Sequence, residues 1–380
     1  MKILLLGDYS AVQGNLKIGL EILGHDVTLV SSRDGFKKIP VDIDLDSSRP
    51  GVLGKIDRFL KPQLLSRTLD GYDIVQVINP FIFFRHKLPN WVNQIYYQRI
   101  FQYLKSHNNK VFMLAAGSDA YFWRNTESNM RYSPHRDEIK YDLNGNMHPL
   151  ARPRAFDFNQ KFLEWVDGVI PTIFEYEIAY AGEDKLLSAI PVPVDVDSIN
   201  FMGNKKRKNI NLFHGLNRPG VKGTHHVAAA FDKILQMRSG VETNMKGYLP
   251  LSDYLELMYK MDIVVDQVNA YSLGMNGLFA MAMGKVVLGG SEPESLACLG
   301  LTDSPVVNVL PDKKDIVEKL VNLLDDPNGL EERSFASRKF VERVHDCKKV
   351  AQNFLDVWEN PEQHKNQHKI LSTAGYLNAS

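Results

Sequence analysis

The stretch AYSLGMNGLFAMAMGKVVLGG, from Ala270 to Gly290, indicates the architecture of the second half of the chain. GMNGLFAMAM has the apolar content of a short buried helix, and KVVLGG that of a strand in a parallel sheet. Gly274 marks the helix start, where free N–H groups and the positive end of the helix dipole attract anions. The stretch contains no acidic residue. It therefore predicts a phosphate-binding helix in an α/β domain, with no carboxylate of its own.

A second loop of similar character is FHGLNRPGVKGTHHV, from Phe213 to Val227. A strand-like start leads into a loop that carries glycines and two cations, Arg218 and Lys222. Glycine lets a backbone approach a ligand closely, Arg forks across two oxygens, and Lys is a compact point charge. Parallel strands point their carboxyl ends toward one edge of a sheet, so we expect this loop and the helix start at Gly274 to border one crevice.

Short β-type runs alternate with helical patterns along most of the chain, which is typical of parallel sheets covered by helices. The alternation begins at KILLLG (residues 2–7) and restarts after SAIPVPVD (188–195). We predict two successive doubly wound domains with a hinge near Val192 to Met202, and a ligand in the cleft between them.

Composition limits the classes of function. The 380 residues are 44% hydrophobic, and 45 basic residues balance 45 acidic ones, so nothing in the overall charge favours a nucleic-acid partner. Two cysteines, Cys298 and Cys347, are too few for a disulfide framework or a thiolate metal site. No run has the length of a signal-peptide core or a membrane span. We expect a cytoplasmic protein whose membrane contact, where there is any, is peripheral.

Two segments depart from the alternation. Residues 121–158 mix aromatics and cations with weak periodicity, and they are either an acceptor-binding or membrane-facing insertion or, the preferred interpretation, a long surface loop with a local helix. The run KKRK (205–208) is either a contact for anionic lipid or phosphate or, preferably, a solvated linker.

We predict no metal site. The triplets DID (42–44), DLD (44–46) and DVD (195–197) lie in a polar loop and at the hinge, where solvated carboxylates are the simpler interpretation. The histidines show no ligand spacing, and His225 and His226 occupy successive helix positions that are expected to face different directions.

These motifs, in this order, resemble the family-four (group 1) retaining glycosyltransferases, which have the GT-B fold. The likeness rests on HGLNRPGVKGTHHVAAAFDKI, YLPLSDYLELMYKMDIVVDQ and GLFAMAMGKVVLGG in the second half, and on MKILLLGDYSAVQGNLKIGLEILGHDVTLVS at the start. IPVPVDVD resembles the interdomain crossing, and SRKFVERVHDCKKVAQNFLDVWE the C-terminal helix that returns to the first domain. The resemblance implies a Rossmann-like acceptor domain (1–195, joined by a helix at about 353–380) and a nucleotide-sugar domain (196–352).

The resemblance also implies roles for individual residues. Arg218 and Lys222 would hold the donor's pyrophosphate and stabilise the leaving group. Asp119 is expected near the acceptor or the transferred sugar, or else caps the following turn; Tyr248 is expected near the nucleobase, or else lies in the core. The predicted donor site comprises Gly14, Gly215, Arg218, Lys222, Tyr248, Asp266, Gly274, Met275, Asn276, Gly277 and Glu292.

The sequence departs from the family at one important point. The family has two glutamates eight positions apart, one at the donor sugar and one at the nucleotide ribose, and the matching positions here are Tyr271 and Phe279. Sugar and ribose recognition must therefore differ or be absent. The polar residues proposed as substitutes are Asp266, Gln267, Asn276 and Glu292.

The function implied is metal-independent, retaining transfer of a hexose from a nucleotide-diphosphate sugar, which is a co-substrate, so no cofactor is expected. The acceptor would be a glycan, glycolipid or glycoprotein in glycan biosynthesis, with no nucleic-acid partner and an unspecified oligomeric state. Two alternatives stay open. One is a non-catalytic nucleotide- or glycan-binding protein derived from a transferase, and the other is a sugar-nucleotide epimerase, which should need carboxylates and histidines around the sugar.

Overall fold

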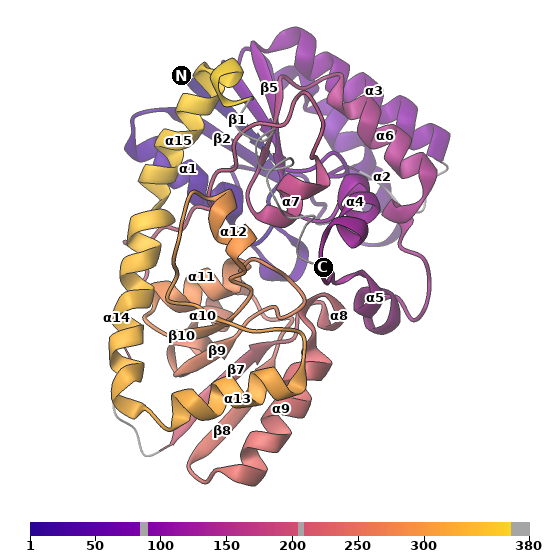
Figure 1. Cartoon of the computed structure of the whole chain (residues 1–380). Helices are drawn as coiled ribbons and strands as arrows, with labels where there is room; N and C mark the ends of the chain where they lie inside the picture. Colours follow the sequence, from indigo (N-terminus) through magenta and orange to yellow (C-terminus); the bar gives the residue numbers. More distant parts are fainter. Residues whose placement is uncertain (84–89, 204–208, 366–380) are drawn as a thin grey trace.

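The computed structural model describes residues 1–83, 90–203 and 209–365, and it contains two parallel β-sheets flanked by helices (Figure 1). This confirms the predicted doubly wound α/β architecture. The strands of the first sheet, in spatial order, are β3 (Ile43–Asp44), β2 (Asp26–Ser31), β1 (Lys2–Leu6), β4 (Ile74–Val77), β5 (Lys110–Ala115) and β6 (Gly168–Pro171). Those of the second are β11 (Val307–Asn308), β10 (Val286–Gly289), β9 (Ile263–Val265), β7 (Ile210–Gly215) and β8 (Val241–Lys246).

Helices connect the strands and cover both faces of each sheet. In the first half they are α1 (Val12–Ile22), α2 (Gly51–Leu64), α3 (Asn90–His107), α4 (Ala120–Asn129), α5 (His135–Asp137), α6 (Pro153–Leu163) and α7 (Phe174–Ala179). In the second half they are α8 (Pro219–Lys222), α9 (Thr224–Met237), α10 (Leu251–Tyr259), α11 (Met275–Ala282), α12 (Pro293–Cys298), α13 (Lys313–Leu324), α14 (Pro327–Val344) and α15 (Cys347–Glu359).

The central strand β1 shows why the sequence forms this sheet. Its residues Ile3 to Leu6 are buried on both faces of the sheet: Leu4 and Leu6 belong to one apolar cluster, and Ile3 and Leu5 to another. Continuous apolar runs of this kind are typical of parallel strands covered by helices on both sides. In each sheet the chain reverses its order beside a central strand, between β1 and β4 in the first and between β7 and β9 in the second. Ligands bind at such switch points, beyond the carboxyl ends of the strands.

The C-terminal helix returns to the first domain. The chain passes near Val194, whose amide donates to His345 O at 2.7 Å and whose carbonyl accepts from the amide of Cys347 at 2.9 Å. Helix α15 then packs against α1, and its Trp358 is fully buried. Figure 1 shows α14 running along the second domain and α15 continuing to the first. The helix expected at about 353–380 begins at Cys347, and residues 366–380 lie outside the described residues.

The preferred interpretation of residues 121–158 as a surface loop was wrong. The segment contains α4, α5, a π-helical turn (Glu138–Asp142), a short 3-10 turn (Pro149–Ala151) and the start of α6. Its aromatic residues explain the difference, because Tyr121, Trp123 and Phe158 are buried against the first domain. Weak periodicity in the sequence reflected several short helices rather than a loop. The run KKRK lies outside the described residues.

Candidate functional site

A cleft of about 530 Å³ opens between the two domains at the carboxyl ends of both sheets. The loops after β1, β4 and β5 form one wall, and the loops after β7 and β9 form the other. The first wall includes Tyr9, Ser10, Asn79, Phe81, Gly117 and Ser118; the second includes Asn217, Arg218, Lys222, Asp266, Gln267, Gly274, Met275 and Asn276. The cleft therefore lies at the switch points of both sheets, as the sequence predicted for the ligand.

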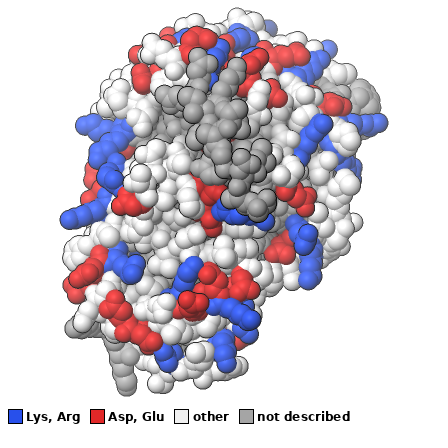
Figure 2. Space-filling model, in the orientation of Figure 1, with Lys and Arg blue, Asp and Glu red and all other residues white. Residues whose placement is uncertain are grey.

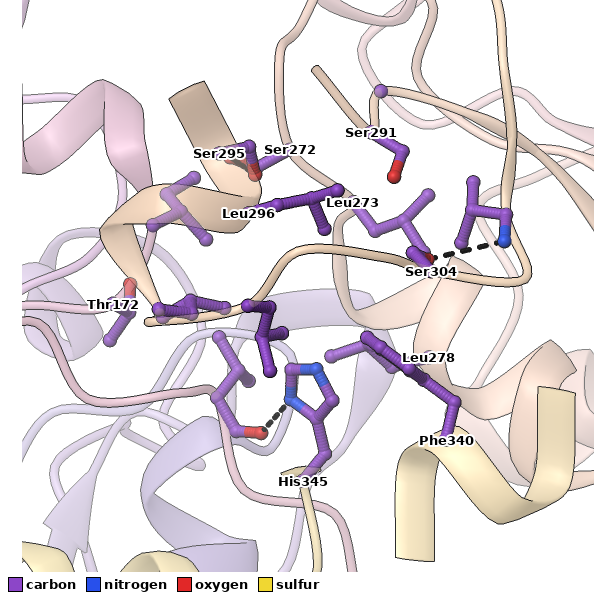
Figure 3. Close-up of a pocket in the computed structure, with 16 residues that line it drawn as sticks. Thr172, Ser272, Leu273, Leu278, Ser291, Ser295, Leu296, Ser304, Phe340 and His345 are labelled. Atoms are coloured by element: carbon purple, nitrogen blue, oxygen red, sulfur yellow. Dashed lines mark hydrogen bonds between the residues drawn. The ribbon is translucent and has the colours of Figure 1, made fainter. Parts of the chain in front are cut away.

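A smaller cavity of about 40 Å³ adjoins the cleft (Figure 3). Leu273, Leu278 and Phe340 give it an apolar lining, and His345 donates from Nδ1 to Val192 O at 2.8 Å at its edge. A volume of this size holds a few water molecules. The larger cleft is therefore the candidate site.

Arg218 reaches from the second domain to the first. It precedes α8 in a left-handed conformation, with φ at 59°. Its Nη2 donates to Glu138 Oε1 at 2.9 Å and to Ser118 Oγ at 3.2 Å. Burial raises the pKa of Glu138, and Arg218 opposes that rise. The ion pair holds a carboxylate of the first domain next to the predicted phosphate site.

Lys222 forms the second ion pair of the cleft. Its Nζ lies 3.1 Å from Asp266 Oδ1, and both side chains are buried. The other carboxylate oxygen accepts from the amide of Gly274 at 2.9 Å. Burial alone would raise the pKa of Asp266, but the Lys222 charge and these hydrogen bonds lower it below its ordinary value. The start of α11 thus receives a carboxylate from Asp266, outside the acid-free stretch that forms the helix.

His214 is a buried histidine near this pair. Its Nδ1 donates to Val265 O at 2.8 Å, which leaves Nε2 to accept from the Thr224 hydroxyl at 2.8 Å. Burial, with the nearby Lys222 charge, lowers the pKa of His214 to about 4. The ring is therefore neutral near pH 7 and fixes the end of β7 to the start of α9.

The predicted donor residues fall into two groups. Arg218, Lys222, Asp266, Gly274, Met275 and Asn276 all line the cleft. The remaining predicted site residues lie beside it or elsewhere: Gly14, Gly215, Gly277, Tyr248, Asp119 and Glu292.

The three glycines of the second group lie beside carboxylates or the cation. Gly14 donates its amide to Asp8 Oδ2 at 3.1 Å. A Cβ added to Gly277 would meet Asp266 Oδ2 at 3.0 Å, and one added to Gly215 would come within 2.4 Å of the Tyr254 hydroxyl. Larger residues at positions 215 and 277 would therefore collide with Tyr254 and Asp266 beside the cleft.

Asp119 and Tyr248 both make contacts with other protein side chains. Asp119 is fully buried and caps α4: Oδ1 accepts from the Phe122 amide at 2.8 Å, and Oδ2 from the Tyr180 hydroxyl at 2.6 Å. Burial raises the pKa of Asp119 to about 6. Tyr248 is 62% exposed, and its ring lies 5.5 Å from that of Phe36 across the domain boundary.

Tyr271 and Phe279, at the positions that the resemblance matches to two glutamates, are not among the residues that line the cleft. Phe279 is buried in the core. The Tyr271 hydroxyl accepts from the Arg131 amide at 2.6 Å, and its ring stacks on Phe174 at 5.5 Å. The Tyr271 side chain therefore packs the second domain against the first.

Glu292 belongs to the same interdomain network. It is buried and accepts from Arg131 at 2.6 Å, from the Tyr132 hydroxyl at 2.8 Å and from Asn308 at 2.9 Å. Arg131 also pairs with Glu294. The residues that approach Glu292 from the first domain therefore come from the 121–158 segment.

Sequence reasoning missed Glu175, a buried carboxylate on α7. Its Oε1 accepts from the amides of Tyr271 and Ser272 at 2.8 and 3.0 Å, and its Oε2 from the Ser272 hydroxyl at 2.6 Å. Burial raises its pKa. Glu175 thus fastens the loop before α11 to the first domain, and no local signal could reveal a contact across so many residues.

Asp8 is a second missed carboxylate, although its position after a strand parallels that of Asp266. It accepts from the amides of Gln13 and Gly14 at 3.0 and 3.1 Å at the start of α1. Burial raises its pKa to about 7. The loop after β1 therefore carries its own carboxylate next to Tyr9 and Ser10 of the cleft.

The raised pKa of Asp8 makes stability pH-dependent. The native state keeps the proton up to about pH 7 while the unfolded chain loses it near 3.8, so the stabilisation is complete below the unfolded pKa and is lost as pH rises toward 7. We expect the free energy of unfolding of the wild type to fall by on the order of 2 kcal/mol between about pH 5 and pH 7. Asp8→Asn should abolish this fall. Urea titrations at both pH values measure it; parallel pH profiles for the two proteins would contradict it.

The prediction that His225 and His226 face different directions was wrong. Their ring centroids lie 3.8 Å apart, and their Nε2 atoms are 3.7 and 4.0 Å from Asp137 Oδ2. Both residues occupy the first turn of α9, where their rings lean toward this carboxylate. The Asp137 oxygen already accepts from Asn269 Nδ2 at 2.8 Å. The three side chains therefore form a polar contact between α5 and α9.

Charges of both signs are interspersed over the face that Figure 2 shows, in keeping with the zero net charge. Within residues 1–83, 90–203 and 209–365, no helix combines the length and apolar character needed to cross a membrane.

Solved structures of the GT-B fold match nearly the whole chain. Sucrose-phosphate synthase from Thermosynechococcus elongatus matches with a TM-score of 0.61 and 13% identity, covering 96% of this chain and 100% of its own. HepE of Anabaena, in complex with UDP and glucose, matches with a TM-score of 0.58 and 13% identity over 95% and 100%. An alpha-glucosyltransferase in complex with UDP-glucose and DNA matches with a TM-score of 0.60 and 12% identity over 94% and 99%.

The chain has the GT-B fold, as these neighbours and its two facing sheets show. No protein-family model matches the sequence. No curated protein matches it either. A putative UDP-N-acetylglucosamine 2-epimerase from Listeria monocytogenes is also similar in structure, with a TM-score of 0.52 and 13% identity over 96% of this chain and 97% of that one. The fold is thus shared by proteins with different activities.

Proposed function

We propose that the protein is a glycosyltransferase that moves a sugar from a nucleotide-diphosphate donor to a glycan, glycolipid or glycoprotein acceptor, without a metal and with retention. One observation carries the proposal: Arg218, Lys222 and the helix start at Gly274 come from two loops of one sheet and border one interdomain cleft. This combination suits a diphosphate, because two cations and a helix N-terminus act on neighbouring phosphates. The neighbours that bind UDP or UDP-glucose in the same fold support it.

The chemistry would rest on charge already held in place. The bond between the anomeric carbon and the donor's phosphate oxygen breaks, and the departing diphosphate gains negative charge that Arg218, Lys222 and the positive end of the helix that starts after Gly274 stabilise. A bond then forms from the anomeric carbon to the acceptor oxygen on the same face, and the acceptor's proton passes to the leaving phosphate oxygen. This route needs no general-base carboxylate and no metal ion.

Both cations are paired with carboxylates before a donor binds. Glu138 neutralises Arg218, and Asp266 neutralises Lys222. A donor diphosphate would therefore compete with Glu138 for Arg218, which links donor binding to the contact between the two domains. Lys222 would keep Asp266 as its partner, since both are buried.

A second candidate is a non-catalytic nucleotide- or glycan-binding protein. The buried aromatic contacts of Tyr271 and Phe279 favour it, because no carboxylate stands at either position of the family's glutamate pair. Both candidates predict nucleotide binding, and only the first predicts transfer of sugar from a donor.

A panel of nucleotides tests the shared part of the two candidates. We expect one of UDP, GDP, ADP or CDP, held at 100 times its dissociation constant, to raise the free energy of unfolding by about 2.7 kcal/mol. Thermal unfolding with each nucleotide measures this, with the matching nucleoside as control. Equal melting temperatures with every nucleotide would contradict a nucleotide site. If a nucleotide binds but no sugar moves from its sugar derivatives to any acceptor, the binding-protein candidate replaces the transferase.

A further inference from the structure

The outward face of α2 is apolar along the whole helix. Val52, Ile56, Leu60 and Leu64 recur at every fourth position, and Leu53 lies beside them. Their exposed fractions are 68, 48, 41 and 73%, and that of Leu53 is 64%. At 3.6 residues per turn these five side chains span about 120° of the helix circumference. We call them the α2 apolar face.

Other residues of α2 anchor the helix to the first domain. Gly54 and Pro62 are buried, and the Phe59 ring stacks on Tyr96 of α3 at 4.4 Å. Lys61 Nζ donates to the carbonyl of Asp44 in the edge strand β3 at 3.2 Å. Helix α2 is therefore packed against the first domain, and the α2 apolar face remains on the surface of the protein. Figure 1 shows α2 in the first domain, and α15 packs on the other face of the same sheet.

Basic residues border the α2 apolar face. Five basic residues and one acidic residue, Asp57, lie between positions 49 and 67, whereas the whole chain has no net charge. Arg49, Lys55 and Arg67 are exposed. A short helix with an apolar face and flanking cations is the pattern of an amphipathic helix that lies in the interface of a membrane containing anionic lipids.

We propose that α2 docks this protein on an anionic membrane surface, with the α2 apolar face inserted among the lipids and the flanking cations at the headgroups. A second copy of the chain is a less suitable occupant, because a symmetric α2 contact would bring the same cations together. The docking proposal rests on the side chains of α2 alone and does not depend on the proposed glycosyl transfer. Where both hold, the acceptor domain faces a lipid surface.

Co-sedimentation of the full chain with vesicles tests the proposal. We expect binding to phosphatidylcholine vesicles that contain phosphatidylglycerol, weaker binding to phosphatidylcholine alone, and a decrease with added salt. Leu53→Ser with Leu60→Ser is expected to lower the partition coefficient by about tenfold or more, because it removes two of the inserting side chains. Lys55→Glu with Arg67→Glu should lower binding to the anionic vesicles only.

A matched control is Leu235→Ser with Met237→Ser. These residues are 47 and 42% exposed on α9 of the second domain, and their replacement should leave vesicle binding unchanged. Circular dichroism and nucleotide affinity, which α2 should not affect, verify that each variant is folded. Absence of nucleotide binding in the wild type would count against the proposed function and not against docking.

Three outcomes would overturn docking on lipid. The first is that the wild type fails to sediment with anionic vesicles. The second is that the folded α2 variant sediments as well as the wild type, and the third is that the control variant loses as much binding as the α2 variant. A wild type that dimerises in sedimentation velocity, ignores vesicles and becomes monomeric in the α2 variant would assign the face to a second copy of the chain instead.

Discussion

Replacing Arg218 and Lys222 together by uncharged residues is expected to lower the affinity for a nucleoside diphosphate by at least about 100-fold, because each charged hydrogen bond contributes about 1.5–3 kcal/mol. Isothermal titration with the nucleotide selected by the panel measures the change. Affinity for the nucleoside without phosphates should stay the same in both proteins, since neither cation is expected to reach the base.

Folding has to be controlled in this experiment, because Lys222 is buried beside Asp266. Removing the cation alone would leave an unpaired buried carboxylate, which destabilises a protein by about 3–5 kcal/mol. We therefore suggest Arg218→Ala with Lys222→Met and Asp266→Asn, in which the Asn oxygen can still accept from Gly274. Arg238→Ala, on an exposed ion pair with Asp325, is the matched control in the same domain. Unchanged nucleotide affinity in the folded variant would show that the phosphate site is elsewhere.

Gly19→Val is expected to destabilise the protein by about 3 kcal/mol or more, since overpacking against a backbone cannot relax through rotamer changes. Gly19 faces the first turn of α15, and a Cβ at that position would stand 2.1 Å from the carbonyl oxygen of Cys347 and 3.0 Å from the Cβ of Ala351. The substitution would force α15 away from α1 and expose Trp358. Urea unfolding monitored by tryptophan fluorescence measures the loss.

Glu21→Val is the matched control for Gly19→Val, because it places the same β-branched side chain in the same helix at an exposed position. Its only ion pair is a 3.5 Å contact with Lys17 among the described residues. We expect it to cost no more than about 1 kcal/mol. If both variants lose the same stability, close packing of α15 on α1 is not what holds the C-terminal helix in place.

Local patterns were sufficient to predict the fold and part of the candidate site. The apolar runs of β1 and the glycines and cations after β7 act through neighbours in sequence, so their pattern can be read without coordinates. Parallel strands then bring Arg218, Lys222 and Gly274 to one cleft by geometry alone. The roles of these residues in binding and transfer stay predictions.

Other predictions failed where contacts between distant residues decide the structure. The 121–158 segment lacks a clear period because its short helices are held by burial of Tyr121 and Trp123 rather than by local propensity. His225 and His226 converge because both rings approach the same carboxylate, Asp137, which belongs to another element. Nothing within α9 indicates this.

The sequence by itself determined two α/β domains, a crossing near Val194 and two glycine-bearing loops, because each depends on residues adjacent in the chain. Only the tertiary structure decided how these loops are neutralised and held. Glu138 meets Arg218 across 80 positions, and Glu175 meets Tyr271 across 96. Such pairs form only when folding brings the domains together, since electrostatic partners are chosen by distance in space and by burial. The acid missing from the Ala270–Gly290 stretch is thus supplied from outside it, by Asp266 and Glu175.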